Sequence, residues 1–345
     1  GGGRLISRMR TAGRVSSCCT TSPSRSLPSF VLLGPPSCGT STLFGLLVSH
    51  PLVLPPLVRE PAFFDHRKPA WVSDHCCEYL NSFPISNGTS ITITGEATET
   101  SLVQAAPSAV QLVVPAAKLI VLLRCPVARA SSLFLSRSRI GLDQSGPGHS
   151  PARAFELALR GELGRLRNCT IQTDDAAAGR PCAVGQLVCP GMYIRWLRYW
   201  AATWPRSALL SLFSEELELA LASRSESNLR SYLRAPLQHV GLAPDAAALP
   251  SRLGDTAAGL ANTSGADGGD LGAELLAVAD ELTCSTFGPV NAELAKWLGR
   301  SVPDVWRCKQ ATRSFSGLAS QLANPYGMVR VREPPSERHR ATAPS

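Results

Sequence analysis

Residues 34–42, GPPSCGTST, combine glycines and hydroxyl side chains at a spacing suited to binding an anion. Gly34 and Gly39 are spaced as in the G-x-x-x-x-G of a P-loop, but Thr40 stands where the lysine of that motif would follow. Free N–H groups at a helix N-terminus bind phosphate-like groups with help from the helix dipole. The stretch predicts a phosphate site without the signature of a nucleotide triphosphatase. An ordinary strand-to-helix turn is the alternative.

Arginine and serine residues form a second candidate anion site farther along the chain. Arg124 follows the apolar run 118–123, and Ser131 and Ser132 come in the first turn of a predicted helix. Ligands of an open α/β sheet bind at the carboxyl ends of its strands. The pattern therefore predicts that Arg124 binds an anionic group. The alternative is that Arg124 pairs with a structural carboxylate.

A carboxylate that could accept a proton stands in the segment 59–65, REPAFFD. Glu60 lies beside Arg59 and shortly before Phe63 and Phe64. A carboxylate within hydrogen-bond reach of a substrate hydroxyl can act as a general base. From the residues alone, the segment favours a loop whose phenyl rings pack at the edge of the core while Glu60 is solvated.

Apolar runs and their periodicity predict the elements that would carry these residues. Phe30–Leu33 forms a short buried strand, and leucines recur at helical spacing after the glycine turn. Further strands or extended segments are predicted at 51–58, 91–94, 118–123 and 208–213. Helices are predicted within 70–90, at 100–114, 151–167, 191–205 and before Gly241, and at 273–284 and 289–298. This alternation predicts a three-layer α/β domain with a mostly parallel sheet.

Composition shifts suggest where the domain begins and ends. Residues 1–28 are rich in arginine and serine and are predicted to be disordered, as a stalk, a transit-like segment or the product of a truncated gene model. One domain is expected over 29–308, with insertions at about 142–190 and 243–272, followed by a poorly ordered basic tail at 309–345. No apolar run approaches the roughly 18 residues of a transmembrane helix.

Charge and cysteine content narrow the function classes. The formal net charge of +8, carried mostly by arginine, suits an anionic ligand, but no dense basic run with interleaved aromatics indicates nucleic acid. The 11 cysteines form no C-x-x-C pair, so no metal site is expected. Sequons at Asn87, Asn168 and Asn262, together with the cysteines, favour the secretory pathway.

Six motifs in order, from about Phe30 to Trp306, resemble those of Golgi-type carbohydrate sulfotransferases, closest to the heparan sulfate branch. The matching segments are PSCGTSTL (36–43), REPAFFD (59–65), EATETS (96–101), KLIVLLRCPVARASS (118–132), GMYIRWLRYW (191–200) and FGPVNAELAKWLG (287–299). The strand that ends before Glu215 and Glu216 also matches. The resemblance implies a P-loop NTPase-like sulfotransferase fold, 3′-phosphoadenosine 5′-phosphosulfate as donor and no metal. It also implies a glycan acceptor and a Golgi location, with an anchor not visible in this chain.

The same resemblance implies roles for individual residues. Glu60 matches the glutamate that takes the acceptor's proton, and Arg59 and Glu96 fall in segments that contact substrate. Arg124 and Ser132 would hold the donor's 3′-phosphate. The residues that would bind the 5′-phosphosulfate are Ser37, Cys38, Gly39, Thr40, Ser41 and Thr42.

Three departures from the family pattern bear on activity. The donor-loop lysine is Ser37 here, the lysine of the EKTP pattern is Ala97, and the histidine of the HFF pattern is Ala62. Either another cation, Arg59 or Lys68, replaces the loop lysine, or the protein is a weak or inactive enzyme that retains nucleotide or glycan binding. A P-loop kinase is disfavoured by Thr40 and by the lack of a clear acidic metal-binding strand end.

Overall fold

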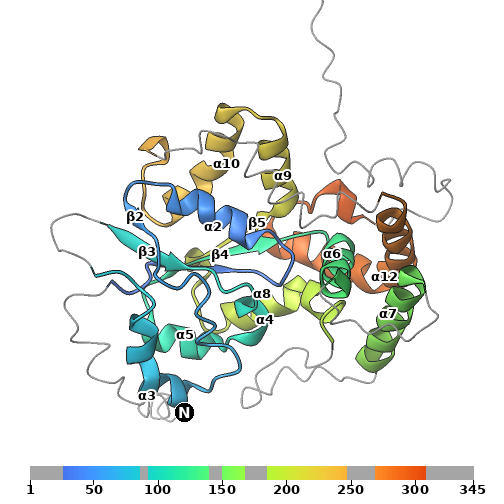
Figure 1. The fold of residues 1–345 in the computed structure, drawn as a ribbon, viewed down its shortest axis with the longest axis horizontal. Coiled ribbons are helices and arrows are strands. Elements are labelled where there is room, and N and C mark those ends of the chain that lie inside the picture. Colours follow the sequence, from blue (N-terminus) through green and yellow to red (C-terminus); the bar gives the residue numbers. More distant parts are fainter. Residues whose placement is uncertain (1–25, 86–91, 140–149, 168–184, 247–268, 308–345) are drawn as a thin grey trace, which may run out of the picture.

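A parallel sheet forms the centre of the molecule (Figure 1). The computed structural model describes residues 26–85, 92–139, 150–167, 185–246 and 269–307. Within these residues the sheet has 5 strands in the order β2-β3-β1-β4-β5, and every pairing is parallel. The strands are β1 (Phe30–Leu33), β2 (Val53–Leu54), β3 (Ile93–Glu96), β4 (Lys118–Leu123) and β5 (Leu209–Phe213). The predicted α/β class with a mostly parallel sheet is confirmed.

Helices cover both faces of the sheet, as Figure 1 shows. Alternate residues of β1 point to opposite faces: Phe30 and Leu32 join one apolar cluster, and Val31 and Leu33 join the other. The first face carries α2 (Thr40–Val48), α9 (Ser214–Ala222) and α10 (Glu226–His239). The second face carries α3 (Pro69–Leu80), α4 (Ser101–Gln104), α5 (Pro107–Val113) and α8 (Tyr193–Ala201). Burial on both faces explains why the central strands are apolar throughout.

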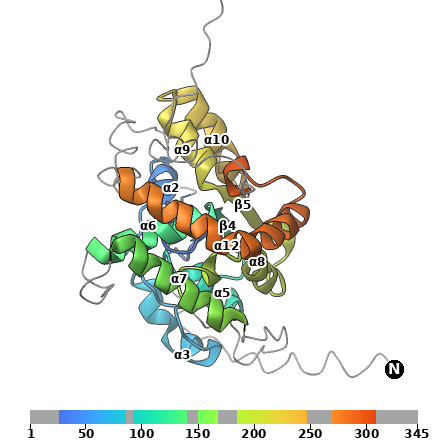
Figure 2. The ribbon, with the colours of Figure 1, turned by 90° about the vertical axis from the view of Figure 1, so that its right-hand side faces the viewer.

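A third group of helices packs beside this layered core (Figure 2). It consists of α6 (Pro126–Arg139), α7 (Pro151–Arg167) and α12 (Gly269–Leu298), which share an apolar cluster of their own. Short 3-10 turns lie at Cys189–Gly191, Arg206–Ala208, Pro244–Ala246 and Asp304–Trp306. Because α6 starts at the end of β4 and α12 also contacts α8, this group is joined to the carboxyl edge of the sheet.

The structure divides one predicted helix and joins two others. The helix predicted at 100–114 is divided into α4 and α5, because Pro107 disfavours a helical conformation at Ala106. The two helices predicted at 273–284 and 289–298 form the single helix α12, which continues through Pro289. Packing of α12 against α6, α7 and α8 outweighs the local preference of proline to end a helix.

The aromatic residues of α8 and the turn after it belong to the core, as predicted. Trp196, Trp200 and Trp204 are at most 2% exposed. The indole N–H groups of Trp200 and Trp204 donate to the carbonyls of Leu102 (3.0 Å) and Pro107 (3.3 Å). These bonds attach α8 and the turn after it to α4 and α5 on the second face of the sheet.

Four described cysteines, Cys76, Cys77, Cys189 and Cys284, are disulfide-bonded.

The described helices include none with both the length and the apolar character needed to cross a membrane. The three sequons and the tail at 309–345 lie outside the described residues, as do most of the two predicted insertions and residues 1–25.

Candidate functional site

The glycine loop between β1 and α2 has a backbone that most side chains disfavour. Gly39 and Ser37 adopt left-handed conformations, with φ of 85° and 71°. A Cβ on Gly34 would lie 2.6 Å from Cγ2 of Thr40 and 3.3 Å from the carbonyl oxygen of Leu122 on β4, so the loop has no room for a side chain there. The N–H of Thr42 donates to the carbonyl oxygen of Gly39 at 3.1 Å. The N–H groups of Thr40 and Ser41, at the first two positions of α2, precede the first hydrogen bond of the helix and therefore suit an anion.

The side chains of the loop differ in what they can offer a ligand. Cys38 and Thr40 are buried, whereas Ser41 is exposed and Thr42 is half-buried. The Cys38 Sγ atom lies 3.9 Å from the Tyr193 hydroxyl, and burial raises the pKa of this thiol to about 12. Cys38 therefore presents its main chain, while Ser41 and Thr42 can also offer hydroxyl groups.

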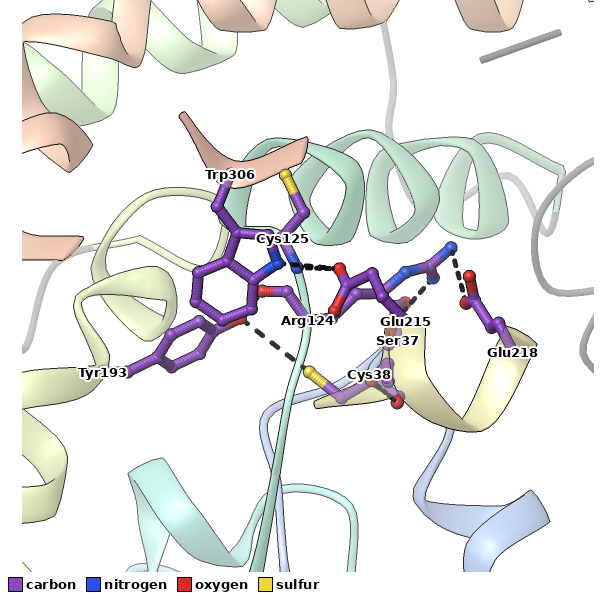
Figure 3. A network of polar contacts seen from close by, with 9 residues as sticks. Ser37, Cys38, Arg124, Cys125, Tyr193, Glu215, Glu218 and Trp306 are labelled. Carbon is purple, nitrogen blue, oxygen red and sulfur yellow. Dashed lines mark hydrogen bonds and ion pairs between the residues drawn. The ribbon is translucent and has the colours of Figure 1, made fainter. Parts of the chain in front are cut away.

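Arg124 joins the end of β4 to this loop (Figure 3). Its Nη1 donates to the carbonyl oxygen of Ser37 at 2.9 Å, and its Nη2 lies 3.6 Å from Oε1 of Glu218 on α9. The side chains of Arg124 and Glu218 are 10% and 16% exposed. The structure thus brings together two candidate anion-binding segments that are 87 residues apart. It also gives Arg124 a carboxylate partner, which was the alternative left open by the sequence.

Glu215 fixes the backbone next to Arg124. Its Oε1 accepts hydrogen bonds from the N–H of Cys125 (2.6 Å) and the indole N–H of Trp306 (2.9 Å), as Figure 3 shows. Burial raises the pKa of Glu215 to about 7, although the Cys125 N–H opposes this shift. The Tyr193 hydroxyl donates to the carbonyl oxygen of Arg124 at 2.7 Å. The end of β4 is therefore held from α8, α9 and the segment after α12.

Arg129 places a second buried positive charge behind the loop. It is 0% exposed and donates to the carbonyls of Pro36 (3.4 Å), Gln186 (2.9 Å) and Leu187. The carboxylate of Glu162 on α7 accepts hydrogen bonds from the N–H groups of Gln186 and Leu187 at 2.8–3.0 Å. Part of the predicted insertion at 142–190 is therefore built into the support of the loop.

Among the described residues, the two cations proposed to replace the loop lysine make no hydrogen bond to the loop. Arg59 pairs with Glu60, and Lys68 directly precedes α3. In the described part of the chain, the arginines that bond to the loop backbone are Arg124 and Arg129. Ser132 lies in the second turn of α6 rather than the first, because the helix already starts at Pro126, and its side chain is 7% exposed.

Glu60 lies on a loop that is tied to the segment after β3. Its Oε1 is 3.0 Å from Nη2 of Arg59, and its side chain is 29% exposed. The N–H of Ala62 donates to the Thr98 hydroxyl at 3.2 Å, and the Thr100 hydroxyl donates to Asp65. Glu60 is therefore held at a defined place, accessible to a ligand.

Phe63 and Phe64 pack beneath this loop, as predicted, with Phe64 1% exposed.

Glu99 is an additional carboxylate beside Glu60 that sequence reasoning did not single out. Its pKa is raised by partial burial and by the Glu60 carboxylate, and Arg59 and Arg137 oppose the shift.

Glu96 ends β3 inside the protein. It is 1% exposed, and neither carboxylate oxygen has a hydrogen-bond partner among the described residues. Burial raises the pKa of Glu96 to about 8; the nearby Tyr79 hydroxyl opposes the shift, and Asp65 adds to it. The predicted contact between Glu96 and a substrate would require this carboxyl group to become accessible.

We expect Glu96→Gln to remove a pH-dependent loss of stability. Between pH 4.5 and about 8 the folded protein keeps a proton that the unfolded chain has lost, so the free energy of unfolding falls as the pH rises. The variant should match the wild type at pH 5 and exceed it by a few kcal/mol at pH 8 in urea denaturation. Glu78→Gln, an exposed change on α3, is the control. Equal effects at both pH values would contradict the assignment.

Comparison with solved structures identifies the fold. The fold is similar to that of a sulfotransferase from Alicyclobacillus acidocaldarius, with a TM-score of 0.51 and 19% identity, covering 81% of this chain and 99% of that chain. Mouse sulfotransferase SULT7A1 complexed with PAP matches with a TM-score of 0.38 and 13% identity over 75% of this chain and 73% of that one. The sulfotransferase domain from the Curacin biosynthetic pathway has a TM-score of 0.38 and 14% identity over 81% and 100%.

The TM-scores of 0.38 for the mouse and Curacin-pathway structures are too low to support a conclusion about this chain. No protein-family model matches the chain, and no curated protein matches it significantly. The chain therefore has a sulfotransferase fold, as the likeness to the bacterial structure shows. The described residues contain no group of three His, Cys, Asp or Glu side chains arranged to hold a metal ion.

Proposed function

We propose that the protein is a sulfotransferase that moves a sulfuryl group from 3′-phosphoadenosine 5′-phosphosulfate to a hydroxyl or amine of a glycosaminoglycan-like glycan. The observation that carries the proposal is the contact between Arg124 and Ser37 at the carboxyl edge of a sulfotransferase-fold sheet. This hydrogen bond joins two segments that the sequence pattern predicts, separately, to bind anions. A donor with phosphate groups at both ends of its ribose needs two such sites side by side.

The proposed reaction is an in-line displacement. The acceptor oxygen or nitrogen forms a bond to sulfur, and the bond from sulfur to the bridging oxygen of the 5′-phosphate breaks. The acceptor's proton passes to Glu60, and 3′-phosphoadenosine 5′-phosphate (PAP) leaves. Such transfers depend mainly on positioning and on neutralising charge. The N–H groups at the start of α2 and the hydroxyls of Ser41 and Thr42 would hold the 5′ end, and Arg124 and Ser132 the 3′-phosphate.

The acceptor and the location are further parts of the proposal. The partly exposed Glu60 beside Arg59 suits a hydroxyl or amine carried by an acidic glycan. Four disulfide-bonded cysteines are typical of an oxidising compartment, which supports the Golgi lumen or membrane. We propose no nucleic-acid partner.

A second candidate is a catalytically weak or inactive protein that retains nucleotide or glycan binding. The observation in its favour is Ser37, which puts no positive charge where the resembled family has its donor-loop lysine. Removal of one preorganised group that stabilises transition-state charge typically lowers a rate by 10²–10³.

We expect Ser37→Lys to raise the rate of sulfuryl transfer. A lysine here would stabilise the charge that develops on the leaving bridging oxygen. We expect a gain in rate of about tenfold, which is smaller than the roughly 10²–10³-fold loss that usually follows removal of such a group. The measurement is the initial rate of label transfer, with Ser37→Gln as an uncharged control of similar length. A gain with both variants, or with neither, would show that the missing charge does not limit the rate.

The donor assignment is tested by titrating the wild-type protein with PAP in a calorimeter. Binding of PAP with weaker or no binding of ATP is the expected result, because Thr40 replaces the lysine that a triphosphate site requires. Tighter binding of ATP than of PAP would favour a kinase-like function. Absence of PAP binding would refute the transferase and an inactive relative that retains nucleotide binding.

A further inference from the structure

Arg124 already has an anionic partner at the place where the proposed function needs it to bind a phosphate. Its guanidinium donates to the carbonyl oxygen of Ser37 with one nitrogen, and another nitrogen faces Glu218 at 3.6 Å. Figure 3 shows the guanidinium between these two groups. Both charged side chains are largely buried, so water screens their interaction only in part.

Glu218 differs from the other two glutamates at the start of α9 in what it contacts. Glu215 accepts hydrogen bonds from Cys125 and Trp306. Glu216 pairs with Arg300 at 3.0 Å on a more exposed surface. Glu218 is the carboxylate of this helix that pairs with the candidate phosphate-binding arginine.

We propose that Glu218 competes with the donor's 3′-phosphate for Arg124 and thereby limits how tightly the protein binds its donor. This inference rests on the proposed function. A phosphate that binds the guanidinium in a fork must approach the Glu218 carboxylate, and two negative charges at a partly buried site repel each other strongly. Donor binding therefore includes the displacement of Glu218 from Arg124. Glu218 is a specificity-determining residue that acts on the 3′ end of the nucleotide and not on its 5′ end.

The experiment compares two nucleotides that differ at the 3′ position. PAP and adenosine 5′-monophosphate are titrated calorimetrically into the wild type, Glu218→Gln and the control Glu216→Gln. Glutamine keeps the shape of the side chain and a neutral acceptor for Arg124, so its orientation is retained. We expect Glu218→Gln to lower the Kd of PAP at least about tenfold and that of the monophosphate less than about twofold. Glu216→Gln should change neither, and thermal denaturation checks that each variant is folded.

The possible outcomes separate this inference from the proposed function. If the wild type binds PAP and Glu218→Gln binds it equally well or more weakly, Glu218 only orients Arg124 and the competition is refuted. Equal gains for both nucleotides would also refute it, because the effect would not be specific to the 3′-phosphate. If PAP binds only to Glu218→Gln, the competition is supported in its strongest form. If PAP binds to none of the three proteins, the proposed function fails, and the inference fails with it.

Discussion

Replacement of Arg124 by alanine is expected to weaken PAP binding by at least about a hundredfold. The variant loses the fork that would hold the 3′-phosphate and the hydrogen bond to the carbonyl oxygen of Ser37. It also leaves the Glu218 carboxylate without its ion-pair partner at the same place. Truncation of one member of a buried charged contact typically costs about 2–5 kcal/mol of binding free energy. Calorimetric titration with PAP measures the loss directly.

Two companion variants make the Arg124 result interpretable. Arg124→Lys keeps the charge but not the planar fork, so an intermediate loss is expected. Arg153→Ala removes an arginine that pairs with Glu156 on the surface of α7 and should leave PAP binding unchanged. A folded Arg124→Ala protein that binds PAP as tightly as the wild type would show that the 3′-phosphate site lies elsewhere.

Replacement of Glu60 by glutamine is expected to lower kcat/KM for sulfuryl transfer by about 10²–10⁴, the usual contribution of a general base. Glutamine has nearly the same size but cannot take up the acceptor's proton. Glu60 lies on the loop before α3, and among the described residues it makes no hydrogen bond or ion pair with the donor loop, so the affinity for PAP should be unchanged. Initial rates with a sulfate-labelled donor and calorimetry with PAP together separate the two effects.

Glu99→Gln is the matched control for Glu60, because the two carboxylates influence each other and Glu99 is also accessible to solvent. We expect a smaller loss from Glu99→Gln than from Glu60→Gln. A large loss from Glu99→Gln with near-normal transfer by Glu60→Gln would assign the base to Glu99 instead.

The sheet could be predicted because its determinants are local. The apolar runs at 30–33, 118–123 and 208–213 became β1, β4 and β5 with little shift, since strands buried on both faces need unbroken apolar sequence. The glycine spacing likewise located the loop between β1 and α2. At Gly34 the reason became visible only in the structure, where Thr40 and the Leu122 carbonyl fill the space of a side chain.

The partners of the charged residues could not be predicted, because they come from distant parts of the chain. Nothing near Arg124 in the sequence indicates that Glu218 will face it. Arg129 is a comparable case, since its acceptors include Gln186, which lies 57 residues away in a segment predicted to be an insertion. The continuous helix α12 was missed for a similar reason: local sequence predicts a break at Pro289, but packing against three other helices overrides it.

The most direct test of the central claim is transfer of labelled sulfate from 3′-phosphoadenosine 5′-phosphosulfate to a panel of glycosaminoglycans and their desulfated forms. The proposal predicts that the wild-type protein transfers label to at least one glycan and that transfer requires Glu60. Binding of PAP without transfer to any acceptor, by the wild type and by Ser37→Lys alike, would contradict the claim of catalysis. The protein would then be a nucleotide-binding relative with a sulfotransferase fold.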